Sequence, residues 1–407
     1  MALIVQKYGG SSVADANKIR NVASRLVKTK LMGNQVVAVV SAMGDTTDDL
    51  IEKAHKINPR PREREMDVLL STGEIVSSSL LTMALHAMGH EAVSLSGAQA
   101  GIETDSIHSS ARISSINPKR LVKELERGNI VIVAGFQGIS KEMDTTTLGR
   151  GGSDTTAVAL AASLKARQCH IYTDVEGVFT ADPRMVPEAR RLDEIGYEEM
   201  LELATWGAKV MHPRAVEVGE VYGIPIYVAC SFNEKPGTLI HGGANMEIRN
   251  KVRAIAHDLD VAKISVLGIP DKPGIASAIF EPLAHANISV DTIVQNSSVD
   301  KMADLSFTVG KGDLARAMDI VQPVCDKIGA RGCMKDDTLG KISVVGTGMQ
   351  NAPGYAATLF RTLSEQNINI EMITTSEIRI TCIIAKDKVK DALKALHKAF
   401  EMDKVNL

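Results

Sequence analysis

Along the first 245 or so residues, short apolar runs alternate with longer stretches in which apolar residues recur every three or four positions. The short runs are "ALIV", "QVVAVV", "EAVSL", "NIVIVA" and "QCHIYT", and each is soon followed by Gly, Ser, Thr or Asp. The helical spacing covers residues 14–30, 117–127 and 153–167. Short apolar runs predict buried strands, and the longer spacing predicts helices. Their alternation predicts an α/β domain with a mostly parallel sheet between helices.

The longest helical pattern follows the second apolar run and contains an interior glycine. Its candidate buried residues are Met66, Leu69, Leu70, Leu80, Leu81 and Met88. Gly73 and Glu74, in "STGE", interrupt the apolar pattern. A glycine inside a helix costs about 1 kcal/mol relative to alanine, so it needs a reason. Either a ligand or another backbone comes close to Gly73, or the helix simply packs tightly there.

The last third of the chain contains an internal repeat. "PGIASAIFEPLAHANISVDTI" at 273–293 recurs 80 residues later as "PGYAATLFRTLSEQNINIEMI", and "KISVLG" recurs as "KISVVG". A strand-like run and a helical pattern follow each copy. Two copies are too few for a solenoid. The repeat therefore predicts two related β-α-β-β-α modules that pack against each other.

Four loops with glycine and small polar residues follow the predicted strands: "KYGGSSV", "SAMGD", "GFQG" and "TDVEGV". In a parallel sheet, ligands bind beyond the carboxyl ends of the strands, where these loops lie. The first loop places Lys7 beside Gly9 and Gly10, and bare backbone N–H groups next to a lysine can hold a phosphate. It matches neither standard nucleotide-binding fingerprint. A glycine turn with a surface lysine is the alternative.

A second candidate anion site lies at "LGRGGSDTT", where Arg150 to Asp154 precede an alanine-rich helical pattern. The N-terminus of a helix attracts anions, and two glycines and an arginine next to it strengthen that prediction. Ser153 or Asp154 acting only as a helix cap is the alternative. The turns in "TDVEGVFTADPR" have a simpler explanation in ordinary turn chemistry. Three such loops at one edge of a sheet favour a binding site.

Composition narrows the possible functions. The net charge is −3 and aromatic residues make up 3% of the 407 residues, so neither a basic surface nor a stacking platform for nucleic acid is expected. The five scattered cysteines argue against a zinc site or a disulfide framework and are typical of a reducing cytosol. No apolar run approaches 18 residues and no signal-peptide pattern begins the chain, so we expect no membrane span and no secretion.

Six motifs together carry a family resemblance: "KYGGSSV", "VVSAMGDTTD", "STGE", "GRGGSDTTAVALA", "TDVEGVFTADPR" and "GAKVMHPRA". In this order, and followed by the repeated modules, they resemble the aspartate kinases over nearly the whole chain. The resemblance implies an amino-acid-kinase fold over residues 1–245, followed by two ferredoxin-like ACT domains. The first ACT domain is expected at 262–335, and the second, which it interrupts, at 250–261 and 336–407.

The implied reaction is transfer of the ATP γ-phosphate to the side-chain carboxylate of L-aspartate, giving 4-phospho-L-aspartate. This is the first step toward lysine, threonine, methionine and diaminopimelate. The resemblance implies that Lys7 and Asp154 are catalytic. It also implies that Arg150 binds the α-carboxylate of the substrate and that Glu74 binds its α-ammonium. Mg²⁺ is expected with ATP, held mainly by the phosphates, so no residue is assigned as a metal ligand.

The resemblance also implies two sets of binding residues. The nucleotide is expected at Lys7, Tyr8, Gly9, Gly10, Ser11, Ser41, Thr173, Asp174, Phe179, Thr180, Ala181, Asp182, Pro183, Arg184, Lys209 and Val210. Aspartate is expected at Ser41, Asp45, Thr46, Thr47, Asp48, Asp49, Glu74, Arg150, Gly151, Gly152, Ser153 and Asp154. Phe179 departs from the family, in which tyrosine is common at this position.

Paired ACT modules imply feedback control by lysine, threonine or both. The expected effector residues are Asp271, Gly274, Ala276, Asp291, Gln295, Asn369, Ile370, Ser376 and Glu377. Because such modules commonly pair between subunits, we expect a homodimer or homotetramer, or a hetero-oligomer with a short regulatory chain. The expected location is the cytoplasm, with neither nucleic acid nor membrane as a partner.

Two other functions remain open at this point. One is a kinase of the same fold that acts on glutamate, N-acetylglutamate or a nucleotide, although "STGE" and the tandem modules argue against it. The other is a non-catalytic amino-acid sensor, although the intact Lys7, Glu74, Arg150 and Asp154 argue against that.

Overall fold

The structure is a computed structural model that describes the chain except residues 209, 244–251, 298–301, 350–352 and 405–407. The chain divides into two compact units. The first unit comprises Met1–Val178, Arg191–Thr205 and Lys209–Asn245, and the second comprises Phe179–Arg190, Trp206–Ala208 and Met246–Leu407. Two short segments that the sequence places in the kinase region, Phe179–Arg190 and Trp206–Ala208, therefore pack with the C-terminal third.

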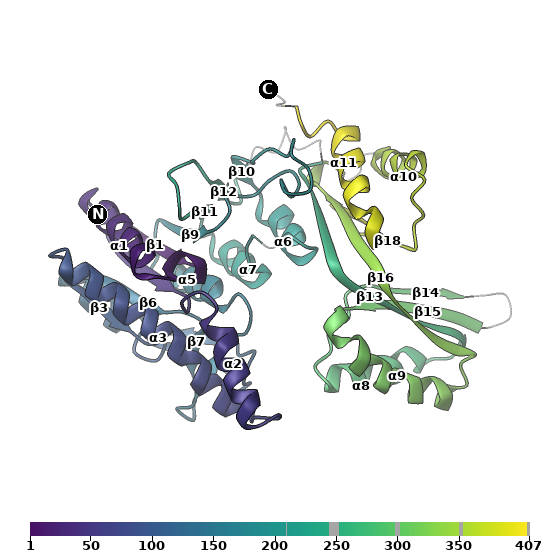
Figure 1. Ribbon diagram of the computed structural model, residues 1–407, viewed down its shortest axis with the longest axis horizontal. Helices are drawn as coiled ribbons and strands as arrows, with labels where there is room; N and C mark the ends of the chain where they lie inside the picture. The colour runs from purple at the N-terminus through teal and green to yellow at the C-terminus, as the bar shows by residue number, and fades with distance from the viewer. Residues whose placement is uncertain (209, 244–251, 298–301, 350–352, 405–407) are drawn as a thin grey trace. The chain divides into compact units, whose positions relative to one another are not determined.

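The first unit is built on an eight-stranded sheet with the strand order β10-β12-β11-β9-β1-β2-β6-β3 (Figure 1). Neighbouring strands from β11 to β3 run parallel, and β12 is antiparallel to β11. The carboxyl ends of β9, β1, β2 and β6 therefore lie side by side, which confirms the expected meeting of the four loops. We call this region the carboxyl edge. The strands are β1 (Leu3–Tyr8), β2 (Gln35–Val40), β3 (Ala92–Leu95), β6 (Ile130–Ala134), β9 (Gln168–Thr173), β10 (Glu194–Ile195), β11 (Ile226–Cys230) and β12 (Thr238–Ile240).

A smaller four-stranded sheet and helices α1 to α7 complete the first unit. The small sheet has the order β5-β4-β7-β8, with β4 (Ile102–Thr104), β5 (Ile113–Ile116), β7 (Gln137–Ile139) and β8 (Thr145–Thr147). The helices are α1 (Ala16–Leu31), α2 (Thr46–Ile57), α3 (Glu63–Ala87), α4 (Lys119–Glu126), α5 (Gly152–Ser163), α6 (Tyr197–Thr205) and α7 (Pro213–Tyr222). The helices expected at 117–127 and 153–167 are thus confirmed as α4 and α5.

Helices cover the large sheet on both faces. Leu26 of α1 and Leu81 of α3 share one hydrophobic core with Tyr8 and Val40 from the strands. Helix α5 contacts β1, β2 and β9 from the other side. Because successive side chains of a strand point to opposite faces, Lys7 points toward α5 while Tyr8 points toward α1.

The buried face of α3 differs from the face that the sequence predicts. Leu80 and Met88 are 39% and 42% exposed, so their assignment to the core is wrong. The buried residues in the first two thirds of α3 are instead small or polar: Asp67, Ser71, Gly73, Glu74, Ser77 and Ser78. By length and composition, α3 is the one helix among the described residues that could cross a membrane. Here it packs against α1, α2 and both sheets.

The second unit contains a six-stranded antiparallel sheet with the order β14-β15-β13-β16-β18-β17 (Figure 1). Its two modules follow the predicted β-α-β-β-α order, which confirms the repeat. The elements are β13 (Ala254–Pro270), α8 (Ile275–His285), β14 (Ile293–Ser297), β15 (Met302–Val309) and α9 (Leu314–Ile328), then β16 (Gly332–Val345), α10 (Tyr355–Glu365), β17 (Met372–Thr375), β18 (Arg379–Ala385) and α11 (Val389–Ala399).

The two modules share their longest strands. Residues 263–267 of β13 pair with 332–336 of β16, whereas residues 254–258 pair with 341–345. The start of β13 therefore extends the sheet of the second module, and its later part belongs to the first.

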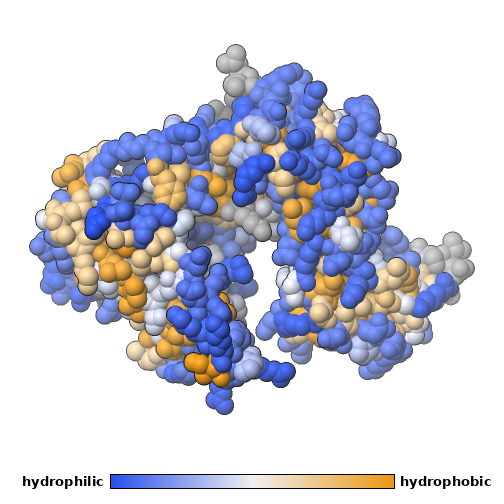
Figure 2. Space-filling model, viewed as in Figure 1, coloured by the Kyte–Doolittle hydropathy of each residue, from blue (hydrophilic) through white to orange (hydrophobic). Residues whose placement is uncertain are grey.

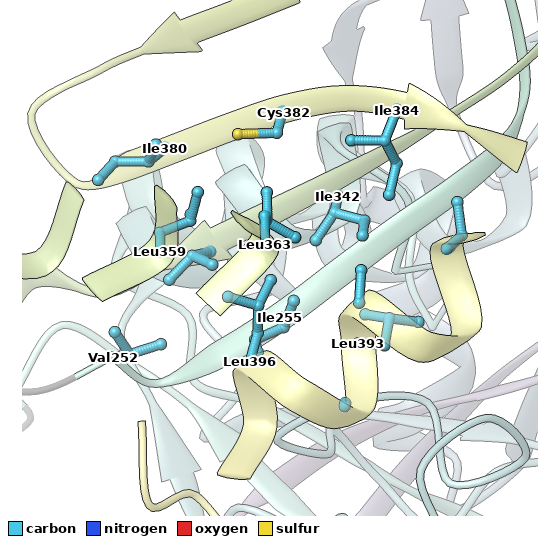
Figure 3. Packing of buried hydrophobic residues seen from close by; sticks show 14 of the residues in the cluster. Val252, Ile255, Ile342, Leu359, Leu363, Ile380, Cys382, Ile384, Leu393 and Leu396 are labelled. Carbon is cyan, nitrogen blue, oxygen red and sulfur yellow. The ribbon is translucent and has the colours of Figure 1, made fainter. Parts of the chain in front are cut away.

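Each module has a core of its own. In the first module, Leu283 of α8 and Val321 of α9 pack with Phe307 of β15. Figure 3 shows the second core, where Leu363 of α10 and Leu396 of α11 lie beside the strands. Ala181 and Val186, from the segment Phe179–Arg190, belong to this second core. The visible surface in Figure 2 is mostly hydrophilic, with smaller apolar patches between the polar regions.

Candidate active site

The loop after β1 forms one side of the carboxyl edge. Gly9 has ordinary backbone angles, and a Cβ added to it would find only Lys7 Nζ, at 3.6 Å, and Tyr172 O, at 3.9 Å. A Cβ on Gly10 would lie 2.8 Å from the carbonyl oxygen of Ala42, in the turn after β2. Gly10 is therefore required for close packing between two loops, whereas Gly9 leaves open space beside the lysine.

Lys7 and Asp154 form an ion pair at this edge. Lys7 Nζ lies 2.6 Å from Asp154 Oδ1, and each side chain is 11% exposed. Asp154 lies in the first turn of α5, where the positive end of the helix dipole favours a carboxylate. The sheet and the helix thus bring together the two residues that the sequence predicts to be catalytic.

Glu74 is a buried carboxylate on α3. It is 3% exposed, and its Oε1 accepts a hydrogen bond of 3.0 Å from the backbone N–H of Ala42. Its Oε2 is buried without a hydrogen-bond partner. Burial is the main cause that raises the pKa of Glu74 to about 7. A buried carboxylate with a free oxygen can receive an ammonium group.

Gly73 explains how Glu74 reaches this position. A Cβ on Gly73 would lie 2.8 Å from the Cβ of Ala42, so alanine there would push α3 away from the turn after β2. The hydroxyl of Ser77 also donates a hydrogen bond of 2.8 Å to the carbonyl oxygen of Ser41. The interior glycine therefore serves tight packing of the helix against the turn after β2, the simpler of the two explanations left open by the sequence.

The loop that carries Arg150 has a fixed backbone. Gly149 and Gly151 adopt positive φ values of 76° and 67°, a conformation that favours glycine. A Cβ on Gly151 would overlap the side chain of His212 at the start of α7. Arg150 itself is exposed, so its guanidinium is accessible to a ligand.

The start of α2 also belongs to this region. Residues 45–49 follow the turn after β2, and Thr46 Cγ2 would lie 3.7 Å from a Cβ on Gly73. The hydroxyl of Thr46 donates to the carbonyl oxygen of Met43, and Asp48 and Asp49 are exposed in the first turn. Ser41, Thr46 and Glu74 thus gather around the same turn, and Asp48 and Asp49 lie in the first turn of α2, where carboxylates stabilise a helix N-terminus.

The expected nucleotide residues fall into two groups. Thr173 is the last residue of β9 and Asp174 follows it at the carboxyl edge, and Thr173 Oγ1 lies 3.1 Å from Asp174 Oδ1. The side chain of Tyr8 is fully buried and stacks on Tyr172, so only its backbone is available to a ligand. Val210 belongs to the first unit, and Lys209 lies outside the described residues.

The second group, Phe179 to Arg184, belongs to the other unit. There Thr180 is 2% exposed, and its hydroxyl is hydrogen-bonded to Nε2 of His397. Asp182 and Arg184 form an ion pair with an N–O distance of 2.8 Å. The side chains of Thr180 and Ala181 are thus buried in the second unit.

Comparison with known proteins decides the family. Residues 2–230 match the amino acid kinase family, and residues 264–323 and 342–400 match the ACT domain. An aspartokinase of Mycolicibacterium smegmatis is 49% identical over 405 residues, which are 98% of this chain and 96% of that protein. An aspartokinase of Thermus thermophilus is 47% identical over 406 residues, covering 99% and 100% of the two chains. The chain belongs to the aspartokinase family.

Solved structures of aspartokinases share the fold. The E. coli aspartokinase III in complex with aspartate and ADP (R-state) has a TM-score of 0.82 and 25% identity, covering 98% of this chain and 100% of that one. The aspartate kinase from Synechocystis has a TM-score of 0.55 and 44% identity, covering 100% of this chain and 70% of that one. These comparisons confirm the α/β kinase fold with ACT domains. The chain is an aspartate kinase, a phosphotransferase of amino-acid biosynthesis that uses ATP with a divalent metal.

The effector residues expected of an aspartokinase lie at the ends of strands and helices in the second unit. Asp271 and Gly274 lie between β13 and α8, and Gln295 lies on β14. Asp291 is 39% exposed and forms an ion pair of 3.0 Å with the buried Lys341 of β16. A pocket of about 410 Å³ is lined by Val294, Asn296, Asp304, Ser306, Ile370, Glu371, Met372 and Ile373.

Two of the expected effector residues adjoin this pocket, and others do not. Ile370 lines it, and Asn369 donates a hydrogen bond of 3.1 Å to Glu371, which also lines it. Ser376 and Glu377 lie in the turn between β17 and β18. Ala276 is exposed on the first turn of α8. The sequence did not single out Glu371, which pairs with Lys263 at 2.9 Å, because no local pattern links residues so far apart in the chain.

Proposed function

We propose that the carboxyl edge of the first unit holds the reacting ends of ATP and L-aspartate. The observation that carries this proposal is the Lys7–Asp154 ion pair, which lies beside the open space at Gly9. Backbone N–H groups of the loop after β1 and the Lys7 ammonium suit the transferring phosphoryl group. Since the substrate carboxylate is already ionised at pH 7, no general base is required. Catalysis then consists of positioning two anions and neutralising their repulsion.

Aspartate lies, in this proposal, between Glu74 and the loop that carries Arg150. The free Oε2 of Glu74 receives the α-ammonium, and the exposed guanidinium of Arg150 binds the α-carboxylate in two hydrogen bonds. The other proposed contacts are Ser41, Asp45, Thr46, Thr47, Asp48, Asp49, Gly151, Gly152, Ser153 and Asp154. Held by both charged ends, the substrate presents its side-chain carboxylate to the phosphoryl group beside Lys7.

The nucleotide is assigned to Thr173, Asp174, Phe179 to Arg184, Lys209 and Val210, together with the loop after β1. Mg²⁺ is the proposed metal, held mainly by phosphate oxygens, as is common for this ion. The described residues contain no group of three or more His, Cys, Asp and Glu that could hold a metal. When bound, Mg²⁺ neutralises phosphate charge.

The second unit, in this proposal, senses the end-products of the pathway. Lysine, threonine or both bind near Asp291 and Gln295, where a carboxylate and an amide can meet a zwitterion. ACT modules pair between subunits, so the enzyme is a homo-oligomer or joins a short regulatory chain, in the cytoplasm. The proposed domain boundaries are 1–245, 262–335, and 250–261 with 336–407.

A hydroxamate assay tests the substrate assignment. The enzyme is incubated with ATP, a magnesium salt and aspartate in hydroxylamine, which traps the acyl phosphate as a hydroxamate. Glutamate is one methylene longer, and a pocket rejects such a change by about 10- to 200-fold in kcat/KM. Equal kcat/KM for aspartate and glutamate would contradict the proposed pocket. Its two charged contacts hold the backbone end of the substrate, so only a side chain of the right length brings its carboxylate to the phosphoryl group.

A further inference from the structure

Asp67 is a fully buried carboxylate on α3 that none of the sequence motifs includes. It lies seven residues before Glu74, on the same side of the helix, and it is 0% exposed. Its Oδ1 accepts hydrogen bonds from the Ser109 N–H at 3.0 Å and the Thr147 hydroxyl at 2.5 Å. Its Oδ2 accepts from the same N–H at 3.1 Å and from Nδ1 of His108 at 2.8 Å. Burial of a charge is costly unless it is paired in this way.

The loop that Asp67 holds has an unfavourable backbone conformation. Ser109 has a φ of 64°, in the left-handed region that residues other than glycine rarely adopt. Such a conformation is strained and persists only where the surroundings impose it. Both carboxylate oxygens of Asp67 accept the N–H of this residue, so Asp67 stabilises the strained conformation directly.

The same carboxylate reaches the strand that leads to Arg150. Thr147 is the last residue of β8, 1% exposed, and its carbonyl oxygen accepts a hydrogen bond of 2.9 Å from Ala111 N–H. A Cβ on Gly149 would lie 3.0 Å from the carbonyl oxygen of Ser109. Asp67 therefore fixes both sides of the contact between the 108–111 loop and the turn before Arg150.

Arg214 of α7 completes the support from the other side. Its guanidinium donates to the carbonyl oxygen of Leu148 at 2.8 Å and to that of Ala111 at 3.0 Å. The turn at 147–151 thus donates a hydrogen bond to Asp67 of α3 and accepts hydrogen bonds from the 108–111 loop and from α7. Arg150 projects from a turn that is held through the Thr147 hydroxyl and through the carbonyl oxygens of Thr147 and Leu148.

We propose that Asp67 is a positioning residue for aspartate binding, acting through the 147–151 turn on the guanidinium of Arg150. This inference rests on the proposed role of Arg150. A displacement of about 1 Å at a binding group can reduce an enzyme's efficiency about 10²-fold. Loss of the Asp67 contacts therefore weakens aspartate binding although Asp67 touches no substrate.

The test uses Asp67→Asn and Thr147→Val in the full-length enzyme. Asparagine keeps the size of Asp67 but offers one acceptor oxygen in place of two, and valine removes only the hydroxyl that links Asp67 to β8. We expect the KM for aspartate to rise about 10-fold or more in each variant, with the KM for ATP within about twofold of the parent. If Asp67→Asn fails to fold, the milder Thr147→Val decides the question alone.

Glu124→Gln is the matched control. Glu124 is also a buried carboxylate, 2% exposed, but its partners Arg120, Arg127 and Asn129 lie on or next to α4. The Glu124→Gln variant should have a lower melting temperature than the parent and an unchanged KM for aspartate. If Asp67→Asn and Thr147→Val behave like this control, Asp67 is merely structural and the inference is wrong.

The double variant Asp67→Asn/Arg150→Ala separates this inference from the proposed pocket. If Asp67 acts through Arg150, the double variant should have the same KM for aspartate as Arg150→Ala alone, because the two effects are not independent. Additive effects would overturn the inference while leaving Arg150 in the pocket. A normal KM in Arg150→Ala would instead overturn the proposed role of Arg150, and with it the inference.

Discussion

Nζ of Lys7 lies 2.6 Å from Oδ1 of Asp154, and both side chains are largely withdrawn from solvent. The pair is close to neutral as a whole, so the edge of the sheet does not repel a phosphate as an isolated carboxylate would. Because the two charges neutralise each other, replacing either residue alone by a neutral one leaves the other as a buried, unpaired charge. Experiments on the catalytic role must therefore separate activity from folding.

The first prediction concerns Lys7→Met. We expect kcat to fall about 10²- to 10³-fold, since this is the usual cost of losing one contact to the transition state. The KM for ATP should change less. Lys7→Met should also lower the melting temperature, because it leaves Asp154 unpaired. The double variant Lys7→Met/Asp154→Asn leaves no unpaired charge, so its melting temperature should be higher than that of Lys7→Met while its activity stays low. Turnover within about threefold of the parent would show that Lys7 does not touch the transferring phosphoryl group.

The second prediction follows from the pKa of Glu74, which burial raises to about 7. Below pH 7 the carboxyl is increasingly protonated and loses its attraction for the α-ammonium of the substrate. The KM for aspartate should therefore rise as the pH falls from 8 to 6, while the KM for ATP should not. Glu74→Gln should have a high KM at every pH in this range. A parent profile that is flat for aspartate would contradict the assignment of Glu74.

The same pKa has a consequence for stability. Because the folded protein binds a proton at Glu74 more tightly than the unfolded chain, the contribution of Glu74 to the free energy of unfolding falls as the pH rises from about 4.5 to above 7. Glu74→Gln carries no such charge. Urea unfolding should find it more stable than the parent at pH 8, with little difference at pH 5. Equal stability of the two proteins at pH 8 would mean that the ionised Glu74 is not penalised by burial.

The third prediction compares two adjacent glycines. A Cβ on Gly10 would lie 2.8 Å from the carbonyl oxygen of Ala42, so Gly10→Ala should lower the melting temperature because two loops must separate. Gly9→Ala has room in the fold but places its methyl group beside Lys7 Nζ, where the phosphate is expected. Thermal unfolding should leave Gly9→Ala near the parent, whereas kinetics should find a raised KM for ATP. The reverse pattern would mean that Gly9, and not Gly10, serves packing.

Periodicity was enough to predict five strands of the large sheet (β1, β2, β3, β6 and β9), the repeat and the loops at the carboxyl edge. Each of these features depends on which residues are apolar and on where glycine follows them, and both are visible in the sequence. Lys7, Glu74 and Asp154 could be selected because they lie beside glycines or interrupt an apolar pattern. Lys7 and Asp154 meet because β1 ends and α5 begins at the carboxyl edge, whereas Glu74 reaches the turn after β2 from α3.

Other features depend on contacts that the sequence does not reveal. The buried face of α3 contains Asp67 and Ser71, whereas Leu80 is partly exposed, because this helix packs on polar loops as well as on the sheet. The spacing of Asp67, Ser71, Glu74 and Ser78 on one helical face is a signal that hydrophobicity alone conceals. Ala181 and Val186 enter the core of the second unit through long-range packing, and no local pattern predicts such a partner.

The last prediction uses Trp206, the single tryptophan of the chain, as a reporter of effector binding. The guanidinium carbon of Arg379 lies 3.8 Å from the centre of the Trp206 ring, and Lys341 Nζ lies 4.8 Å from it. Lys341 is also the ion-pair partner of Asp291, one of the proposed effector residues. An ammonium group that binds Asp291 competes with Lys341 for the carboxylate and changes the cation at the indole ring.

Titration with lysine, threonine or both should therefore change the tryptophan emission over the same concentrations that inhibit the enzyme. Asp291→Asn should abolish the emission change and relieve inhibition, while leaving the uninhibited kcat nearly unchanged. Asp313→Asn is the matched control, because Asp313 is also 39% exposed and paired, with Arg316, but belongs to no proposed site. It should retain both responses. Inhibition without any change in emission would show that effector binding does not reach Lys341, and would exclude Asp291 as the group that receives the effector's ammonium.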